Sequence, residues 1–208
     1  MIPEKYRKQP PVQVNYSFED LLANVGYVEL VCVFDEADEY SFQRLPLDST
    51  TKRKNYGDIG VGLQGEVNID YTFLTSQLVK GNAFLSITLF AQALSTQTTT
   101  CYLKIRVLHV SGVTETLIGT QQTTDTLTQT DDAATLYHRT TLKFALDKQF
   151  TKGEILRVEI ETWSDHATNT NKGFYVDGGN KAWGQTEDSV AIGSNIILEV
   201  PFDLGGVL

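Results

Sequence analysis

Two glutamates on one predicted strand are the residues best placed for acid–base chemistry. Glu159 and Glu161 alternate with apolar residues in the segment 154–163, so both side chains lie on one face of the strand. Positions two apart along a strand are separated by about 7 Å, a distance at which two carboxyl groups can hydrolyse a glycosidic bond with inversion. The polar side of any half-buried strand has the same alternation, so the pair alone does not predict an enzyme.

A glycine-rich segment, Gly60-Val-Gly62-Leu-Gln-Gly65, has the spacing of a dinucleotide-binding fingerprint. That fingerprint works only when a strand precedes it and a helix follows, because the helix N-terminus binds the pyrophosphate. Here a charged loop precedes the glycines and a strongly alternating segment follows them. We therefore predict a glycine-rich approach to a strand and no cofactor.

Other residues that catalyse reactions or bind metals are few and scattered. His109 ends a predicted strand, His138 has the inward parity of another, and His166 lies in a polar loop, so no two have metal-ligand spacing. The acidic run 35–39 could bind calcium through its carboxylates, but a solvated loop is the alternative. We interpret residues 177–180 as a turn. We assign no catalytic residue and no metal.

Charge and composition exclude several classes of protein. Asp and Glu outnumber Lys and Arg by 26 to 17, which disfavours a nucleic-acid partner because phosphate contacts need basic side chains. No stretch is apolar for long enough to predict a membrane span, and residues 1–11 do not resemble a secretory signal peptide. Cys32 and Cys101 lie at apolar positions of predicted strands, so we expect buried free thiols. Residues 52–54, Lys-Arg-Lys, are predicted to form a solvated basic loop.

Alternation of apolar and polar residues predicts β-strands along most of the chain. Residues 66–74 are the clearest case, with Val67 and Ile69 opposite Asn68 and Asp70. One apolar and one polar face per strand is typical of antiparallel sheets packed on a single core, so we predict an all-β antiparallel sandwich, most simply a jelly roll. The strongest candidates are 66–74, 83–91, 101–109, 136–146, 154–163 and 195–202, with weaker ones at 27–34, 41–46, 114–120 and 173–177.

The connections between these strands carry turn and loop residues. Lys80-Gly-Asn82, Ser111-Gly112 and Lys152-Gly153 are predicted turns. Longer polar loops are expected at 95–100, 121–135 and 164–172.

One short helix is expected near the N-terminus, at 18–24, where Ser17 could cap it and Gly26 could end it. We therefore divide the chain into an N-terminal arm with this helix, residues 1–26, and a sandwich domain, residues 27–208.

Three large aromatic residues are candidates for contact with a partner. Trp163 has the polar parity of its strand, and Tyr175 and Trp183 lie in the Gly- and Asn-rich stretch that follows. Exposed aromatic side chains commonly contact a protein surface or a sugar ring. The alternative is that a loop folds over Trp163 and buries it.

The first eleven residues form a second candidate contact. Lys5, Arg7 and Lys8 against a single Glu4 make this arm basic on an acidic protein, and its prolines favour an extended chain. Tyr6 is its one large side chain. We expect Tyr6, Arg7 and Lys8 to contact an adjacent, acidic subunit.

Three stretches have the sequence pattern of a known class of proteins. They are Phe73-Leu-Thr-Ser-Gln-Leu-Val-Lys-Gly81, Leu85-Ser-Ile-Thr-Leu89 and Lys152-Gly-Glu-Ile-Leu-Arg-Val-Glu-Ile160. In composition and pattern, residues 66–202 resemble jelly-roll virion proteins of tailed bacteriophages. The resemblance implies a non-enzymatic structural role, as a capsid auxiliary or decoration protein or at the head–tail region. It identifies no site residues, and residues 1–60 match no pattern.

This resemblance also implies partners and a location. They are other virion proteins, including further copies of the chain, on a virion assembled after synthesis in a host cytoplasm, with neither nucleic acid nor membrane bound. Two alternatives remain open. One is a carbohydrate-binding sandwich that stacks sugars on Trp163, Tyr175 and Trp183, possible on a phage tail, and the other is a polysaccharide hydrolase.

Deleting residues 1–11 tests the predicted role of the arm. The deletion removes no residue of a predicted core strand, so the melting temperature should stay within a few degrees in calorimetry. Assembly into an oligomer or particle should fall in sedimentation velocity. A truncated chain that assembles normally would mean that the arm packs on its own domain.

Overall fold

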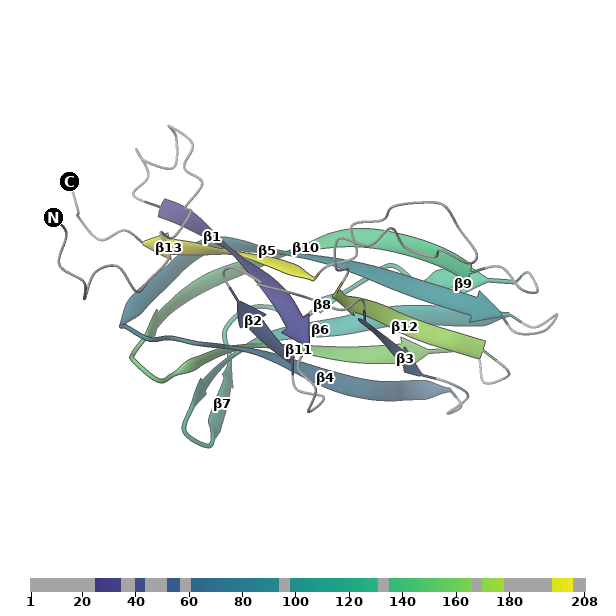
Figure 1. Ribbon diagram of the computed structural model, residues 1–208, viewed down its shortest axis with the longest axis horizontal. Helices are drawn as coiled ribbons and strands as arrows, with labels where there is room; N and C mark the ends of the chain where they lie inside the picture. The colour runs from purple at the N-terminus through teal and green to yellow at the C-terminus, as the bar shows by residue number, and fades with distance from the viewer. Residues whose placement is uncertain are drawn as a thin grey trace, which may run out of the picture.

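The computed structural model of the chain describes residues 25–34, 40–43, 52–56, 61–93, 98–130, 135–165, 170–177 and 196–203. Within these ranges every helix-or-strand element is a β-strand, which confirms the predicted all-β fold (Figure 1). The strands are β1 (Val25–Phe34), β2 (Tyr40–Gln43), β3 (Lys52–Tyr56), β4 (Gly62–Thr72), β5 (Gln77–Ala93), β6 (Thr99–Ser111), β7 (Thr114–Leu117), β8 (Gln122–Thr123), β9 (Leu127–Gln129), β10 (Thr135–Phe150), β11 (Ile155–Ser164), β12 (Thr170–Asp177) and β13 (Ile197–Asp203).

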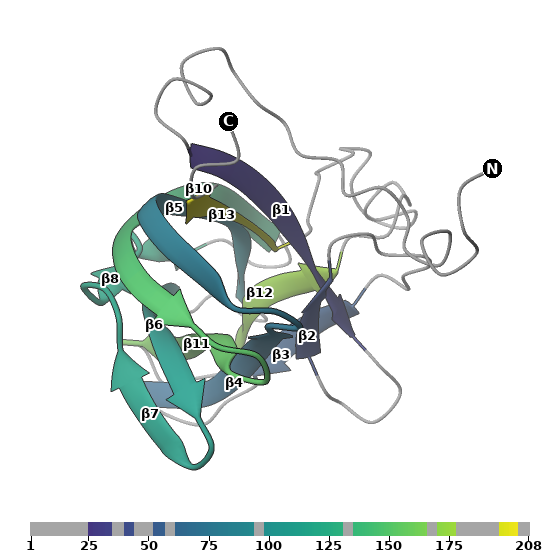
Figure 2. The ribbon, with the colours of Figure 1, turned by 90° about the vertical axis from the view of Figure 1, so that its left-hand side faces the viewer.

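The strands form one hydrogen-bonded network that curls into two layers (Figures 1 and 2). In the first layer, β10, β5, β13 and β1 are neighbours, and β12 and β3 continue from β5. In the second layer, β4, β11, β6 and β7 lie side by side. The short strand β2 joins the layers, because it pairs antiparallel with β1 and parallel with β4. The other pairings are antiparallel, as the predicted sandwich requires.

The core lies between the two layers and is made of the apolar side of each strand. Phe73, which follows β4, stacks on Phe150 of β10 with ring centroids 4.2 Å apart and meets Phe202 of β13 edge-on. Cys32 and Cys101 are fully buried free thiols, as predicted. Burial raises the pKa of the Cys101 thiol to about 12, so this group stays a thiol at neutral pH.

Several polar segments form strands that the alternation did not predict. The expected basic loop at 52–54 is wrong, because Lys52–Tyr56 is strand β3, paired on one side with β12. Lysine-rich edge strands discourage pairing with other chains, so charge does not exclude a strand at this position. The predicted loop 121–135 also contains β8 and β9, which pair with the edge of β6.

Two of the three predicted turns are confirmed. Gly112 and Gly153 lie in the β6–β7 and β10–β11 turns with φ of 60° and 89°, a region that favours glycine. The turn predicted at 80–82 is wrong, because Gly81 lies inside β5 with φ of 133°. A Cβ at Gly81 would come within 3.2 Å of Pro201 in β13, so this glycine allows a close approach between neighbouring strands.

The inward position predicted for His138 is also wrong, since its side chain is exposed. Leu136, of the same parity, is exposed as well, and the buried residues of this face are Phe144, Leu146 and Phe150. The first half of β10 therefore extends beyond the core while keeping its pairing with β5.

Some predictions fall on residues that the structure does not describe. The helix expected at 18–24 and most of the N-terminal arm lie outside the described residues, so the division at residue 26 stays a prediction. No helix in the described part of the chain is long and apolar enough to cross a membrane.

Replacing Gly81 by Ala should destabilise the protein more than the same change at Gly153. Both positions have a φ that strains an L-residue, at about 1–2 kcal/mol, but only at Gly81 does the new Cβ also meet a neighbouring ring. Urea unfolding of the two variants measures the difference. Equal losses of unfolding free energy would show that the contact with Pro201 contributes nothing.

Candidate functional site

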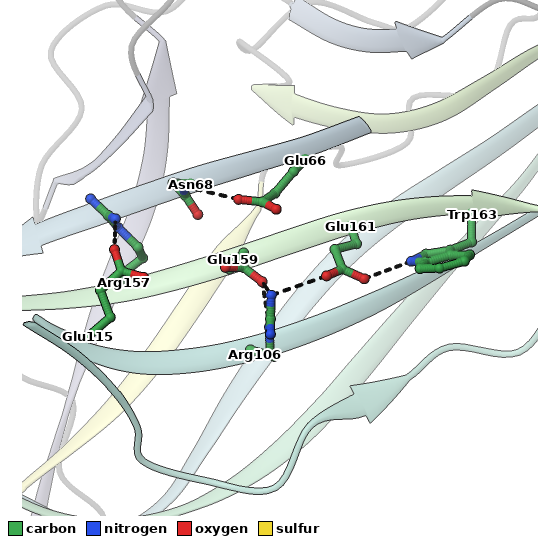
Figure 3. Close-up of polar contacts among 8 residues, drawn as sticks. All are labelled: Glu66, Asn68, Arg106, Glu115, Arg157, Glu159, Glu161 and Trp163. Atoms are coloured by element: carbon green, nitrogen blue, oxygen red, sulfur yellow. Dashed lines mark hydrogen bonds and ion pairs between the residues drawn. The ribbon is translucent and has the colours of Figure 1, made fainter. Parts of the chain in front are cut away.

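The outer side of β4, β11 and β6 carries the densest group of polar side chains that the structure describes. We call this surface the charged face. Odd-numbered residues of β11 point outward, and the pairing with β4 and β6 places matching outward residues beside them. Its polar and aromatic members are Glu66, Asn68 and Asp70 of β4, Arg157, Glu159, Glu161 and Trp163 of β11, and Tyr102, Lys104 and Arg106 of β6. Figure 3 shows seven of them: Glu66, Asn68, Arg106, Arg157, Glu159, Glu161 and Trp163.

Arg106 joins the two glutamates in which the sequence suggested acid–base chemistry. Its guanidinium donates hydrogen bonds to Glu159, and its Nη2 lies 3.1 Å from Oε1 of Glu161. Glu159 is only 6% exposed, and this burial raises the pKa of its carboxyl group although the contact with Arg106 lowers it. The guanidinium therefore offsets the cost of burying a carboxylate on this face.

A third carboxylate, that of Glu66, completes an acidic cluster. One oxygen from each of Glu66, Glu159 and Glu161 lies within 4.8 Å of the other two. The amide of Asn68 donates to Glu66 over 3.4 Å, and Glu66 itself is exposed. Three carboxylates could hold a hard cation, but the Arg106 guanidinium already contacts two of them. Glu66 thus adds a negative charge that Arg106 does not contact.

Arg157 forms a second ion-pair group at the opposite end of the face. Its Nε and Nη2 each donate to Asp70 over 2.7 Å, a bidentate pair that raises the pKa of the guanidinium. Its Nη1 donates to Glu115 of β7. The two contacts connect β4, β11 and the β6–β7 hairpin across the surface.

Trp163 is half-buried, and the contacts that the structure shows for it come from its own layer. Its Nε1–H donates to Oε2 of Glu161 over 2.8 Å (Figure 3). Nζ of Lys104 lies 3.6 Å from the ring centroid. Tyr102 lies beside it, with ring centroids 6.4 Å apart and planes 19° from parallel. Whether a loop covers the ring stays a prediction, because residues 166–169 and 178–195 lie outside the described part of the chain.

Apolar side chains extend this aromatic end of the charged face. Leu63 of β4 is paired with Trp163 and is 46% exposed, and Val61 just before β4 is 67% exposed. At the other end Leu117 of β7 is 49% exposed. The charged face is therefore a polar, ion-paired centre between two ends with exposed apolar groups.

The structure places only part of the predicted contact residues. Tyr6, Arg7, Lys8 and Trp183 lie outside the described residues. Tyr175 lies in β12, where its backbone pairs with Arg53 and Thr88 in the first layer, whereas Trp163 belongs to the second.

The structure describes only some of the other candidate motifs. After Gly62 and Gly65 the strand β4 continues, as predicted. The run 35–39, His166 and residues 178–180 lie outside the described part. The alternation placed Glu159, Glu161 and Trp163 on one face, which is confirmed. It did not indicate that Arg106 would reach them, because that contact depends on the register between β11 and β6.

A separate polar contact joins His109 of β6 to Glu154. Nε2 of the buried His109 lies 3.1 Å from Oε2 of Glu154, in the turn between β10 and β11. The Thr151 amide also donates to this carboxylate, over 2.7 Å. Hydrogen bonds from Thr151, His109 and Ser111 lower the pKa of Glu154 to about 2.

Comparison with known proteins shows the fold alone. No family model and no curated protein matches the chain. Among solved structures, an aminopeptidase from the marine sediment archaeon Thaumarchaeota archaeon has a TM-score of 0.50 and 10% identity over 87% of this chain. A CocE/NonD family hydrolase from Staphylococcus aureus has a TM-score of 0.49 and 10% identity over 89%, and a chain from the structure of infectious bursal disease virus, Gx strain, has 0.30 and 12% over 88%. This chain spans 37–38% of those chains.

The Glu154 contact should make stability depend on pH in the acidic range. A carboxyl pKa lowered to about 2 means that the folded state binds the proton less readily than the unfolded chain. The stabilisation is complete above the ordinary value near 4.5 and is lost as pH falls towards 2. Urea unfolding from pH 6 to about 2 should show a steeper loss for the native chain than for Glu154→Gln. Parallel curves for the two proteins would contradict this.

Proposed function

We propose that this protein is a non-enzymatic structural component of a tailed-bacteriophage virion. The charged face is the observation that supports a contact role. Arg106 and Arg157 are paired with carboxylates of this face, while Leu63, Val61 and Leu117 at its ends are exposed. An outer surface with ion pairs at its centre and exposed apolar groups at its ends suits contact with another protein.

The sequence resemblance supplies the specific part of this proposal. It favours a capsid auxiliary or decoration protein, or a protein at the head–tail region, that docks on neighbouring subunits. The β-sandwich fits such a role, but the same architecture also occurs in the hydrolases named above, so fold alone does not select it.

A carbohydrate-binding module is the alternative. The nearly parallel rings of Trp163 and Tyr102 favour it, because neighbouring aromatic faces can stack on sugars. Against it, the Lys104 ammonium already lies over the Trp163 ring, and the indole N–H is bound to Glu161. A sugar would first have to displace Lys104 from that ring face.

Substitution of the aromatics separates the two functions. Light scattering and negative-stain microscopy of the full chain should show concentration-dependent assembly, and Trp163→Ala and Trp183→Ala should weaken it by about 2 kcal/mol, as for interface anchors. A glycan array should stay blank. Leu136→Ala, an exposed apolar residue of β10, is the control. Glycan binding that Trp163→Ala abolishes, with no assembly at any concentration, would favour the alternative.

A further inference from the structure

Two neighbouring rows of side chains at one end of the charged face differ in chemistry. The pairing of β11 places Leu63 and Tyr102 on either side of Trp163, which gives an aromatic row. Two residues earlier in β11, it places Glu66 and Lys104 on either side of Glu161, which gives an acidic row. Residues two apart on a strand are separated by about 7 Å, so on β11 and β6 the rows lie one side-chain repeat apart. On β4 a bulge opposite Trp163 leaves Leu63 three residues before Glu66.

One carboxylate of the acidic row, that of Glu66, is not contacted by Arg106. Glu66, Glu161 and the adjacent Glu159 cluster within 4.8 Å, and Arg106 contacts Glu159 and Glu161. Glu66 is the exposed member, and its negative charge also favours the protonated form of Glu159. A basic side chain that reached Glu66 would relieve this repulsion.

The chain itself contains a segment with matching spacing. Tyr6 and Lys8 are two residues apart in the basic stretch 1–11, where Pro3 and the pair at 10–11 favour an extended backbone. In an extended chain, side chains two apart point the same way and are separated by about 7 Å. One face of this segment therefore presents an aromatic ring and an ammonium at the separation of the two rows.

We propose that the charged face binds residues 6–8 of a second copy of this chain, with Lys8 at Glu66 and Tyr6 against Leu63 at the end of the aromatic row, away from the Trp163 ring face that Lys104 covers. This inference rests on the proposed structural function, because it names the surface through which neighbouring subunits associate. Arg7 then points away from the face. Since the Lys8–Glu66 pair lies at an exposed edge, it sets register and salt dependence, and Tyr6 supplies most of the buried area.

A charge exchange between the two partners tests the contact in the full chain. Lys8→Glu and Glu66→Lys should each raise the dissociation constant about tenfold in sedimentation velocity at low salt, and the double variant should return it to within about threefold of the native value. Glu199→Lys, at an exposed position of β13, makes the same charge change in the other layer and should leave association unchanged. Far-UV circular dichroism confirms that each variant is folded.

The other outcomes overturn the inference in distinguishable ways. If the native chain associates and both single variants associate equally well, the charged face is not where Lys8 binds, while the structural function stands. If the double variant stays as weak as the single ones, the two residues do not pair. If the full chain is monomeric at every concentration, a second copy is not the partner, and negative-stain microscopy then decides whether the proposed function fails as well.

Discussion

Burial of two apolar strand faces against each other determines where the other groups in the described part of this protein lie. Every second side chain of β5 and of β11 is directed into one core, and Phe73 contacts Phe150 and Phe202 across the two layers. Apolar burial is worth roughly 25 cal/mol per Å², so a slip of one residue in either strand would expose a whole row. The register that keeps these rows inside also aligns the outward residues of β4, β11 and β6 into the charged face.

On that face, ion pairs replace the apolar contacts of the core. Glu159 is nearly as buried as a core residue, which is tolerable because Arg106 lies against it, and Arg157 joins Asp70 to Glu115. These contacts cross strands, so they connect β4, β6, β7 and β11 on the outside of the second layer.

Strand parity alone was enough to predict much of this arrangement. It placed Glu159, Glu161 and Trp163 on one side of β11 and buried both cysteines. Predictions from local residue types were wrong where the structure depends on segments that are distant in the sequence. Gly81 has the neighbours of a turn residue, yet it lies within β5, where it pairs with Leu146 of β10 and lies close to Pro201, a residue 120 positions later in the chain. The parity of His138 likewise says nothing about where the core ends along β10.

The sequence by itself determined that the chain is all-β, acidic, and polar on one side of each strand, because alternation is a local consequence of the pleated backbone. Only the tertiary structure decided that Arg106 meets a glutamate 53 residues away, that Lys104 covers Trp163, and that the pKa of Glu154 falls to about 2. These features depend on which strands become neighbours and in what register. That choice is made by burial of the whole core, which no short segment encodes.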